Sequence, residues 1–290
     1  MRIFTFGCSL TQYFYPTWAD LVITHYEDKH DAHGTNWGRS GAGNQYIATR
    51  IWEANSIHNF NKDDIIFVQW TSMFREDRYH EDHGWSCPGG FNQKTLSGNE
   101  FRLNGFDYHS ELQWADFLHC TMRDCALITS TTRALRAMDC KVITTGFRNF
   151  NEGYEKFKPF KPTTKLKYEN LGAIIDTYKD ELIVDVQPIL NALNFGTDDS
   201  FFESRPRVIP MLGKEYEGHN LPEIHPLPME HLEYAKNYIL EHLGESIHES
   251  AVELAQEYHE KTNNKDLIVL NELGWANLEQ TGFSDDGWRP

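Results

Sequence analysis

Residues 3–11 read Ile-Phe-Thr-Phe-Gly-Cys-Ser-Leu-Thr, and this stretch decides the predicted fold. An apolar, aromatic and β-branched run of strand length ends at a glycine, and a serine follows two positions later. Buried strands of α/β sheets deliver side chains to their carboxyl edge in this way, so Ser9 is a candidate nucleophile. The alternative is that Gly7 and Ser9 only turn the chain into a helix, with Ser9 as its N-cap.

The sequence beyond residue 11 alternates helix and strand signals. The clearest strand covers residues 63–70, because its continuous apolar run is typical of a strand covered on both faces. Further strands are predicted at residues 33–37, 141–146 and 182–186, and helices at 17–26, 44–57, 110–139, 164–178, 228–243 and 246–261. Right-handed crossovers between such strands indicate a five-stranded parallel sheet in a three-layer α/β/α sandwich.

Two irregular stretches interrupt this alternation. Residues 74–108 and 147–164 are too long for ordinary connections, so we predict two loop insertions there. The predicted organisation is one α/β domain over residues 1–244, which contains both insertions, and a C-terminal helix and tail over residues 245–290. A homo-oligomer would form through this C-terminal extension.

The composition restricts the classes of partner. A formal net charge of −16 and a pI near 5.3 disfavour binding to nucleic acid or to an anionic membrane. The five cysteines are odd in number and irregularly spaced, which indicates reduced core residues in a reducing compartment. The first residues predict a strand instead of a signal peptide, and no apolar run approaches membrane-spanning length. We therefore expect a soluble, cytoplasmic protein.

Chemistry gathers where parallel strands end, so the loops after the predicted strands should face one another. Ser9 follows the first strand, residues 36–44 the second and residues 70–72 the third, while residues 223–226, Glu-Ile-His-Pro, lie beyond the fifth. A serine nucleophile needs a general base, an acid to orient that base, and donors for the developing oxyanion. All of these residue types occur in this set of loops.

These blocks resemble the SGNH, or GDSL-type, hydrolase family over residues 2–243. The family's first block, Gly-Asp-Ser-Leu or similar, is similar to residues 7–11, and its second, an Asn-x-Gly-x-Ser-Gly-like turn, is similar to residues 36–41. The resemblance implies a flavodoxin-like sandwich and an esterase, lipase, thioesterase or carbohydrate deacetylase activity. Residues 16–20 also resemble SGNH-type proteins of tailed phages, and a phage-encoded member would be associated with the virion.

The resemblance implies a catalytic triad with one displaced member. His225 stands at the family's His-Pro entrance to the last helix and would be the general base for Ser9. Pro222 occupies the place of the family's aspartate, so we assign the orienting acid to Glu223, two residues before the histidine. A backbone carbonyl is the alternative to this carboxylate. Two fallback partners are His219 and Asn220.

The oxyanion donors would be the backbone N–H groups of Ser9 and Gly41 together with a hydroxyl of the third block. The family's asparagine is replaced there, and Ser72 or Thr71 is the candidate donor. Cys8 replaces the family's block-one aspartate. It is an alternative nucleophile, although a buried structural thiol is favoured.

Three residues near these loops are predicted to contact the substrate: Arg75, Asn44 and Trp70. We expect a serine esterase that hydrolyses a small ester, foremost an O-acyl (acetyl) group on a carbohydrate, and that needs no cofactor. The alternative is a catalytically inactive SGNH-fold binding or virion assembly protein. Residues 80–87 contain zinc-ligand types but lack a second paired half, so no metal site is predicted.

Overall fold

The centre of the molecule is a four-stranded parallel sheet with the strand order β2-β1-β3-β8. Its strands are β1 (Arg2–Phe6), β2 (His33–Asn36), β3 (Asp64–Trp70) and β8 (Lys141–Gly146). The computed structural model describes residues 1–13, 15–73, 75, 77–80, 84–86, 102–103, 106–107, 110–150, 177–178, 182, 184–196, 201, 203–208 and 221–263. The expected α/β class with a parallel sheet is therefore found.

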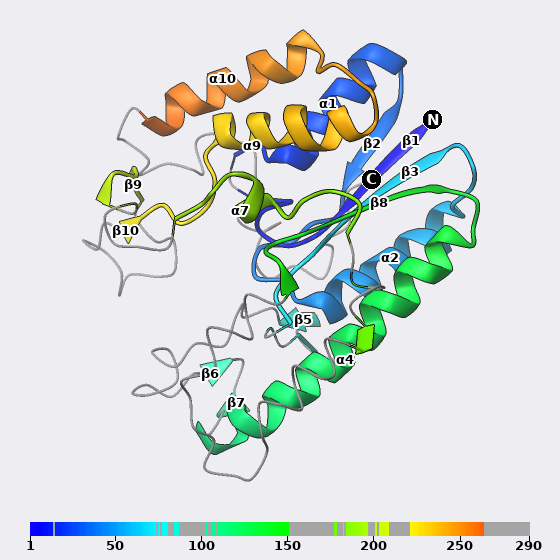
Figure 1. The fold of residues 1–290 in the computed structure, drawn as a ribbon, viewed down its shortest axis with the longest axis vertical. Coiled ribbons are helices and arrows are strands. Elements are labelled where there is room, and N and C mark those ends of the chain that lie inside the picture. Colours follow the sequence, from blue (N-terminus) through cyan, green and yellow to red (C-terminus); the bar gives the residue numbers. More distant parts are fainter. Residues whose placement is uncertain are drawn as a thin grey trace.

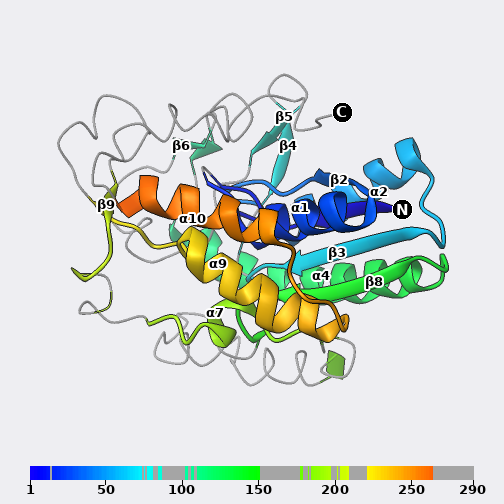
Figure 2. The ribbon, with the colours of Figure 1, turned by 90° about the horizontal axis from the view of Figure 1, so that it is seen from above.

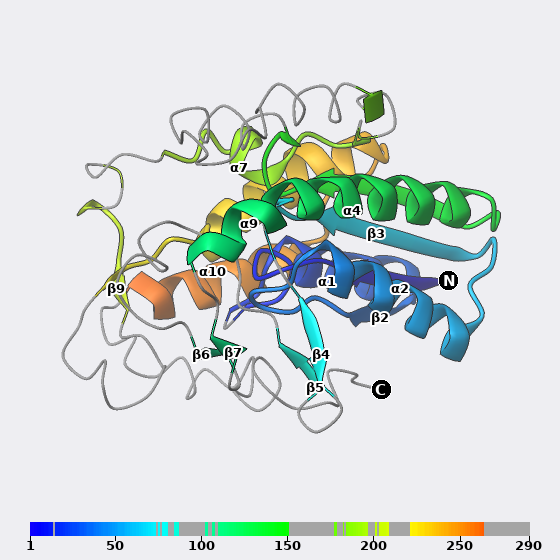
Figure 3. The same cartoon turned by 90° about the horizontal axis from the view of Figure 1, so that it is seen from below.

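Helices cover both faces of this sheet. Figure 1 shows α1 (Trp18–His30), α9 (Pro228–Tyr234) and α10 (Glu249–Asn263) on one face and α2 (Asn44–His58) and α4 (Ser110–Arg136) on the other. Figures 2 and 3 show these two layers from opposite sides. A π-helical turn, η2 (Ala235–Leu240), continues α9, and a short helix, α7 (Ile189–Ala192), follows β8. The carboxyl ends of the strands all open toward one edge of the sandwich.

The core forms where the apolar runs of the strands meet the helices. All seven residues of β3 are buried, as its continuous apolar sequence predicted. Trp18 of α1 makes edge contacts with Phe67 of β3 and Tyr234 of α9, with ring centroids 6.3 and 6.2 Å apart. These contacts fix α1 and α9 against the sheet, and the same two helices support the loops that carry the candidate site.

The fifth strand predicted at residues 182–186 is not a strand in the described part of this segment. Val186 donates its N–H to the Thr144 carbonyl at 3.0 Å, so the chain does run beside β8. The Asp185 carboxylate, however, accepts hydrogen bonds from the Thr144 N–H and hydroxyl, each at 2.8 Å. A side chain thus takes the backbone donor that a carbonyl would take in a regular ladder.

Three antiparallel strand pairs lie outside the central sheet in the part of the chain that the structure describes. They are β4 (Arg78–His80) with β5 (Gly84–Ser86), β6 (Arg102–Leu103) with β7 (Phe106–Asp107), and β9 (Arg207–Val208) with β10 (Leu221–Pro222). The first two pairs belong to the predicted insertion at 74–108. The insertion at 147–164 and the tail beyond residue 263 lie largely or wholly outside the described residues. Among the helices that are described, none is both long and apolar enough to span a membrane.

Candidate active site

Ser9 stands in the loop that leaves β1, and close packing fixes the start of this loop. A Cβ atom at Gly7 would lie 1.9 Å from the Thr11 hydroxyl, so only glycine fits there. That hydroxyl donates to Gln69 Oε1 of β3 at 2.9 Å. The neighbouring strand therefore holds the turn that presents Ser9, which is the placement that the strand-then-serine pattern predicted.

A hydrogen-bonded chain links Ser9 to His225 and Glu223. The Ser9 Oγ lies 3.0 Å from His225 Nε2, and His225 Nδ1 lies 2.8 Å from Glu223 Oε1. An ionised carboxylate can only accept, so Nδ1 carries the proton and Nε2 is left to accept from the serine hydroxyl. The structure thus brings together Ser9 and His225, which are 216 positions apart, with Glu223 two residues before His225, in the arrangement of a nucleophile, a base and an orienting acid.

The Glu223 carboxylate is buried, with 1% of the residue exposed. It curls back toward its own chain, because Oε1 also accepts the His225 backbone N–H at 2.9 Å. Burial by itself would raise the pKa of Glu223, but the hydrogen bonds from His225 and the charge of Arg205 hold this pKa below its ordinary value. Glu223 therefore stays ionised beside the imidazole at neutral pH.

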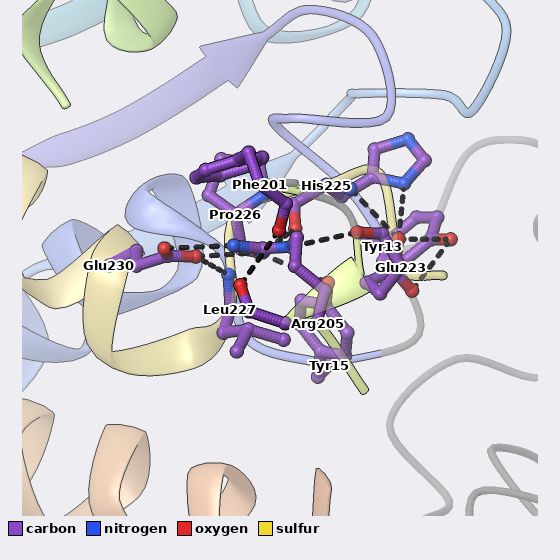
Figure 4. Close-up of polar contacts among 10 residues, drawn as sticks. Tyr13, Tyr15, Phe201, Arg205, Glu223, His225, Pro226, Leu227 and Glu230 are labelled. Carbon is purple, nitrogen blue, oxygen red and sulfur yellow. Dashed lines mark hydrogen bonds and ion pairs between the residues drawn. The ribbon is translucent and has the colours of Figure 1, made fainter. Parts of the chain in front are cut away.

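Tyr13 supports the same pair from the loop after β1. Its ring centroid is 4.0 Å from that of His225, and its hydroxyl lies 3.4 Å from both carboxylate oxygens of Glu223. Burial, followed by the charge of Glu223, raises the pKa of Tyr13 well above its ordinary value, so the phenol remains a donor. Figure 4 shows Tyr13, Glu223 and His225 grouped in this way. No pattern in the sequence predicted this role for Tyr13.

The loop after β2 lies against the end of β1. Trp37 donates its N–H to the Thr5 carbonyl at 2.8 Å, and Arg39 donates to the Gly7 carbonyl at 3.1 Å. Gly41 has a φ of 79°, a left-handed conformation that favours glycine. Among the described residues, neither the Ser9 N–H nor the Gly41 N–H has a hydrogen-bond acceptor, so both predicted backbone donors are available to a ligand.

The two hydroxyls predicted as further oxyanion donors differ in exposure. Thr71 is 1% exposed, and its Oγ1 is buried with no partner among the described residues. Ser72 is half-buried and lies one residue further along the loop after β3. Of this pair, Ser72 is therefore the more exposed.

Asn44, predicted as a substrate contact, is fully buried and its amide is used inside the protein. Its Oδ1 accepts the Thr71 N–H at 2.9 Å, while its Nδ2 donates to the Thr71 carbonyl at 3.1 Å and to Asp124 Oδ2 at 2.9 Å. Burial raises the pKa of Asp124 to about 7, although the charge of Arg123 opposes this shift. The structure therefore gives Asn44 a different task, which is to hold the loop after β3 in place.

Arg75 and Asp77 together hold one peptide unit behind Gly41. Arg75 Nη1 donates to the Ala42 carbonyl at 2.8 Å, and Gly43 donates its N–H to Asp77 Oδ1 at 2.8 Å. Asp77 also accepts the Tyr46 N–H at 2.9 Å, which caps the start of α2. Arg75 is 9% exposed, and its Nε has no partner among the described residues. Arg75 thus lies near the carboxyl edge of the sheet, and its buried Nε makes no hydrogen bond to the described residues.

Trp70, the third predicted substrate contact, does not line an open surface. It is 1% exposed, because the last residue of β3 is still covered on both faces. Cys8 is likewise fully buried, and its Sγ lies 3.8 Å from Gln69 Oε1, while the imidazole of His225 faces Ser9. This geometry favours the structural interpretation of the Cys8 thiol. The fallback partners His219 and Asn220 lie outside the described residues.

A separate cluster of ligand-type residues lies between α1 and the end of η2. Single ligand atoms of His25, His30 and Glu245 fall within 4.8 Å of one another. The Nδ1 of His25 accepts the His248 N–H at 3.0 Å, so in the neutral ring the proton is on Nε2, the atom that would face a cation. The Lys29 ammonium also lies 2.6 Å from Glu245. These contacts favour a cluster held by hydrogen bonds and charge pairs over a metal site.

No protein-family model matches the chain, and no curated protein is significantly similar to it. The function therefore has to be inferred from the residues of the site.

Proposed function

We propose that the protein is a serine hydrolase of SGNH type that cleaves a small ester. The observation that carries this proposal is the continuous chain from Ser9 through His225 to the buried Glu223, with separations of 3.0 and 2.8 Å. A structural histidine at a helix entrance needs neither a serine on one nitrogen nor a buried carboxylate on the other. A serine nucleophile with its general base requires both contacts, the serine on one ring nitrogen and the carboxylate on the other.

In the proposed reaction His225 Nε2 takes the proton of Ser9 Oγ as this oxygen attacks the ester carbonyl. The oxyanion would be held by the N–H groups of Ser9 and Gly41 and by the Ser72 hydroxyl. The tetrahedral intermediate collapses and expels the alcohol, which leaves with the proton from Nε2. Water then gives a proton to His225 and attacks the acyl-enzyme, so that the acid is released and Ser9 is regenerated.

The proposed substrate is an O-acyl, foremost acetyl, group on a carbohydrate. The positive charge of Arg75, which donates to the Ala42 carbonyl next to Gly41, would suit a hydroxyl-rich or anionic ligand. The proposed fold is flavodoxin-like, in which the order β2-β1-β3-β8 corresponds to the first four strands and residues 182–186 take the place of a fifth. A cytoplasmic location, or the virion of a phage, and a homo-oligomer formed through residues 245–290 belong to the same proposal.

A second candidate is a catalytically inactive binding or virion assembly protein with this fold. This candidate is supported by the loop after β3, which has no side-chain amide where the family has its oxyanion asparagine. The amide of Asn44 cannot substitute, because it is hydrogen-bonded to Thr71 and Asp124. A site that lacks a strong third oxyanion donor would bind an ester without cleaving it efficiently.

A fluorophosphonate probe separates the two candidates. We expect a covalent adduct on Ser9, detected by mass spectrometry, and no adduct in Ser9→Ala. The matched control is Cys8→Ala, which should label like the wild type because the thiol is buried and does not face His225. If the folded wild type is not labelled at any pH from 5 to 9, the binding protein is correct. Labelling that survives Ser9→Ala and disappears in Cys8→Ala would move the nucleophile to Cys8.

A further inference from the structure

Arg205 contacts both the proposed acid and the proposed base, although it is itself neither of them. Its Nε donates to the Glu223 carbonyl at 2.7 Å, and its Nη2 donates to the His225 carbonyl. Nη1 and Nη2 also pair with the Glu230 carboxylate at 3.0 and 2.9 Å. Figure 4 shows this guanidinium between Glu230 on one side and Glu223 with His225 on the other.

The guanidinium itself is held in one orientation. Arg205 is 8% exposed, and its Cζ lies 4.7 Å from the centroid of the Phe195 ring and 5.2 Å from that of Phe201. Contacts of this kind favour a planar cation at a fixed position. Three acceptor groups, the Glu223 and His225 carbonyls and the Glu230 carboxylate, therefore meet one buried and packed guanidinium.

Further contacts complete the attachment of residues 223–230. The Glu223 N–H donates to the Pro206 carbonyl at 2.8 Å, next to Arg205 in sequence. Glu230, already paired with Arg205, accepts the Leu227 N–H at 2.6 Å. Both ends of the segment that carries the acid and the base are therefore fixed through one arginine.

This attachment has a consequence for the spacing of the proposed triad. With the acid only two residues before the base, the Glu223 side chain must turn back to reach the ring, and it does so while bonding the His225 N–H. Such a tight turn needs its backbone held, and the two carbonyls that Arg205 binds are those of the acid and the base. We propose that Arg205 is the positioning residue that lets a glutamate at this spacing orient His225.

This inference rests on the proposed hydrolase function for its kinetic test. Arg205→Lys keeps the charge but has no fork, so it cannot reach all three acceptors. We expect kcat to fall about 10²-fold with KM nearly unchanged, the scale of a misplacement of about 1 Å in a catalytic group. Arg136→Lys is the matched control, because Arg136 pairs with Asp185 at 2.8 Å and does not contact residues 223–230. The control should retain wild-type kcat.

A double-mutant cycle shows whether Arg205 acts through Glu223. In a Glu223→Gln background, Arg205→Lys should cost much less than it does in the wild type, since the contact that it positions is already lost. Equal losses in both backgrounds would overturn the proposal and leave Arg205 with a general structural role.

A measurement without turnover keeps this inference separate from the hydrolase proposal. The proton between His225 Nδ1 and Glu223 should give a far-downfield ¹H resonance in the wild type, assigned by its loss in His225→Ala. We expect this resonance to disappear or shift in Arg205→Lys and in Arg205→Met, and to persist in Arg136→Lys. An unchanged resonance in both folded Arg205 variants would refute the positioning role. Failure of the wild type to react with fluorophosphonate would refute only the hydrolase.

Discussion

The nucleophile and the acid–base pair are held in place by different means. Ser9 lies in the loop after β1, and this region is joined to the sheet through backbone groups such as those of Thr5 and Gly7 as well as through the side chains of Thr11 and Gln69. Glu223 and His225 lie on an irregular segment before α9, and it is mainly side chains, Arg205 and Tyr13 among them, that fix their position. The nucleophile half of the site therefore adjoins the strand ends, whereas the acid–base half, residues 223–225, depends mainly on a few side chains of irregular segments.

This difference predicts where the site tolerates substitution. Backbone contacts at strand ends survive most side-chain changes, because every residue carries the same N–H and carbonyl groups. A buried cluster of charged side chains does not, because the removal of one member leaves the others unpaired. Substitution of the proposed acid or base should therefore have the largest effect on activity outside Ser9 itself.

Glu223→Gln is expected to have the largest effect among the residues that do not react directly. An amide in place of the carboxylate cannot favour the Nδ1–H tautomer, so kcat should fall by up to about 10⁴. Steady-state kinetics at pH 7 measure this effect. A loss below about tenfold would mean that a Ser9–His225 dyad suffices without the carboxylate.

Ser72→Ala tests the half of the site that adjoins the strand ends. Loss of one oxyanion donor typically costs about 10²–10³ in kcat, so this variant should show a loss on that scale with little change in KM. Thr71→Val is the matched control, because the Thr71 hydroxyl is buried without a described partner, and its removal should leave kcat unchanged. The reverse pattern would mean that the loop after β3 rearranges on binding and presents Thr71 instead.

The same difference explains what could be predicted from the sequence. Strands β1 and β3 are continuous apolar runs, and Ser9 follows from the glycine and serine that end the first of them. The fifth strand was predicted from apolar residues alone, without the Asp185 carboxylate that takes the Thr144 N–H. Trp70 was predicted at the surface because a strand end was expected to open there, whereas burial continues through the last residue.

No local sequence pattern predicted the residues that hold Glu223 and His225 in place. Tyr13 reaches Glu223 across 210 positions, and Arg205 reaches Glu230 across 25 through a segment without regular periodicity. Periodic patterns report which face of an element is buried, but they do not report which distant side chain will meet a buried carboxylate. The sequence could have predicted only that some donors must surround Glu223, because a buried carboxylate needs hydrogen-bond donors. It could not have predicted which residues supply them.

The smallest expected effect concerns stability in acid. His231 lies in α9, is fully buried, and neither ring nitrogen has a partner among the described residues. Burial lowers the pKa of His231 to about 3 and that of His25 to about 4. When a histidine has a lower pKa in the folded state, the unfolded chain binds its proton first as the pH falls below about 6.5.

Each of these two histidines should therefore reduce the free energy of unfolding by about 1.4 kcal/mol per pH unit between roughly pH 6 and pH 4.5. The lowered pKa of Glu223 places its own contribution below this window, because that stabilisation is lost only as the pH falls through the folded value. Urea unfolding of the wild type and His231→Leu at pH 7, 6, 5 and 4.5 measures the slope. The slope of the unfolding free energy against pH should be smaller in His231→Leu by the contribution of one proton, which is about half of what the two histidines supply together. An unchanged slope would mean that His231 takes up its proton before global unfolding, through a local opening around α9 while the sheet is still folded.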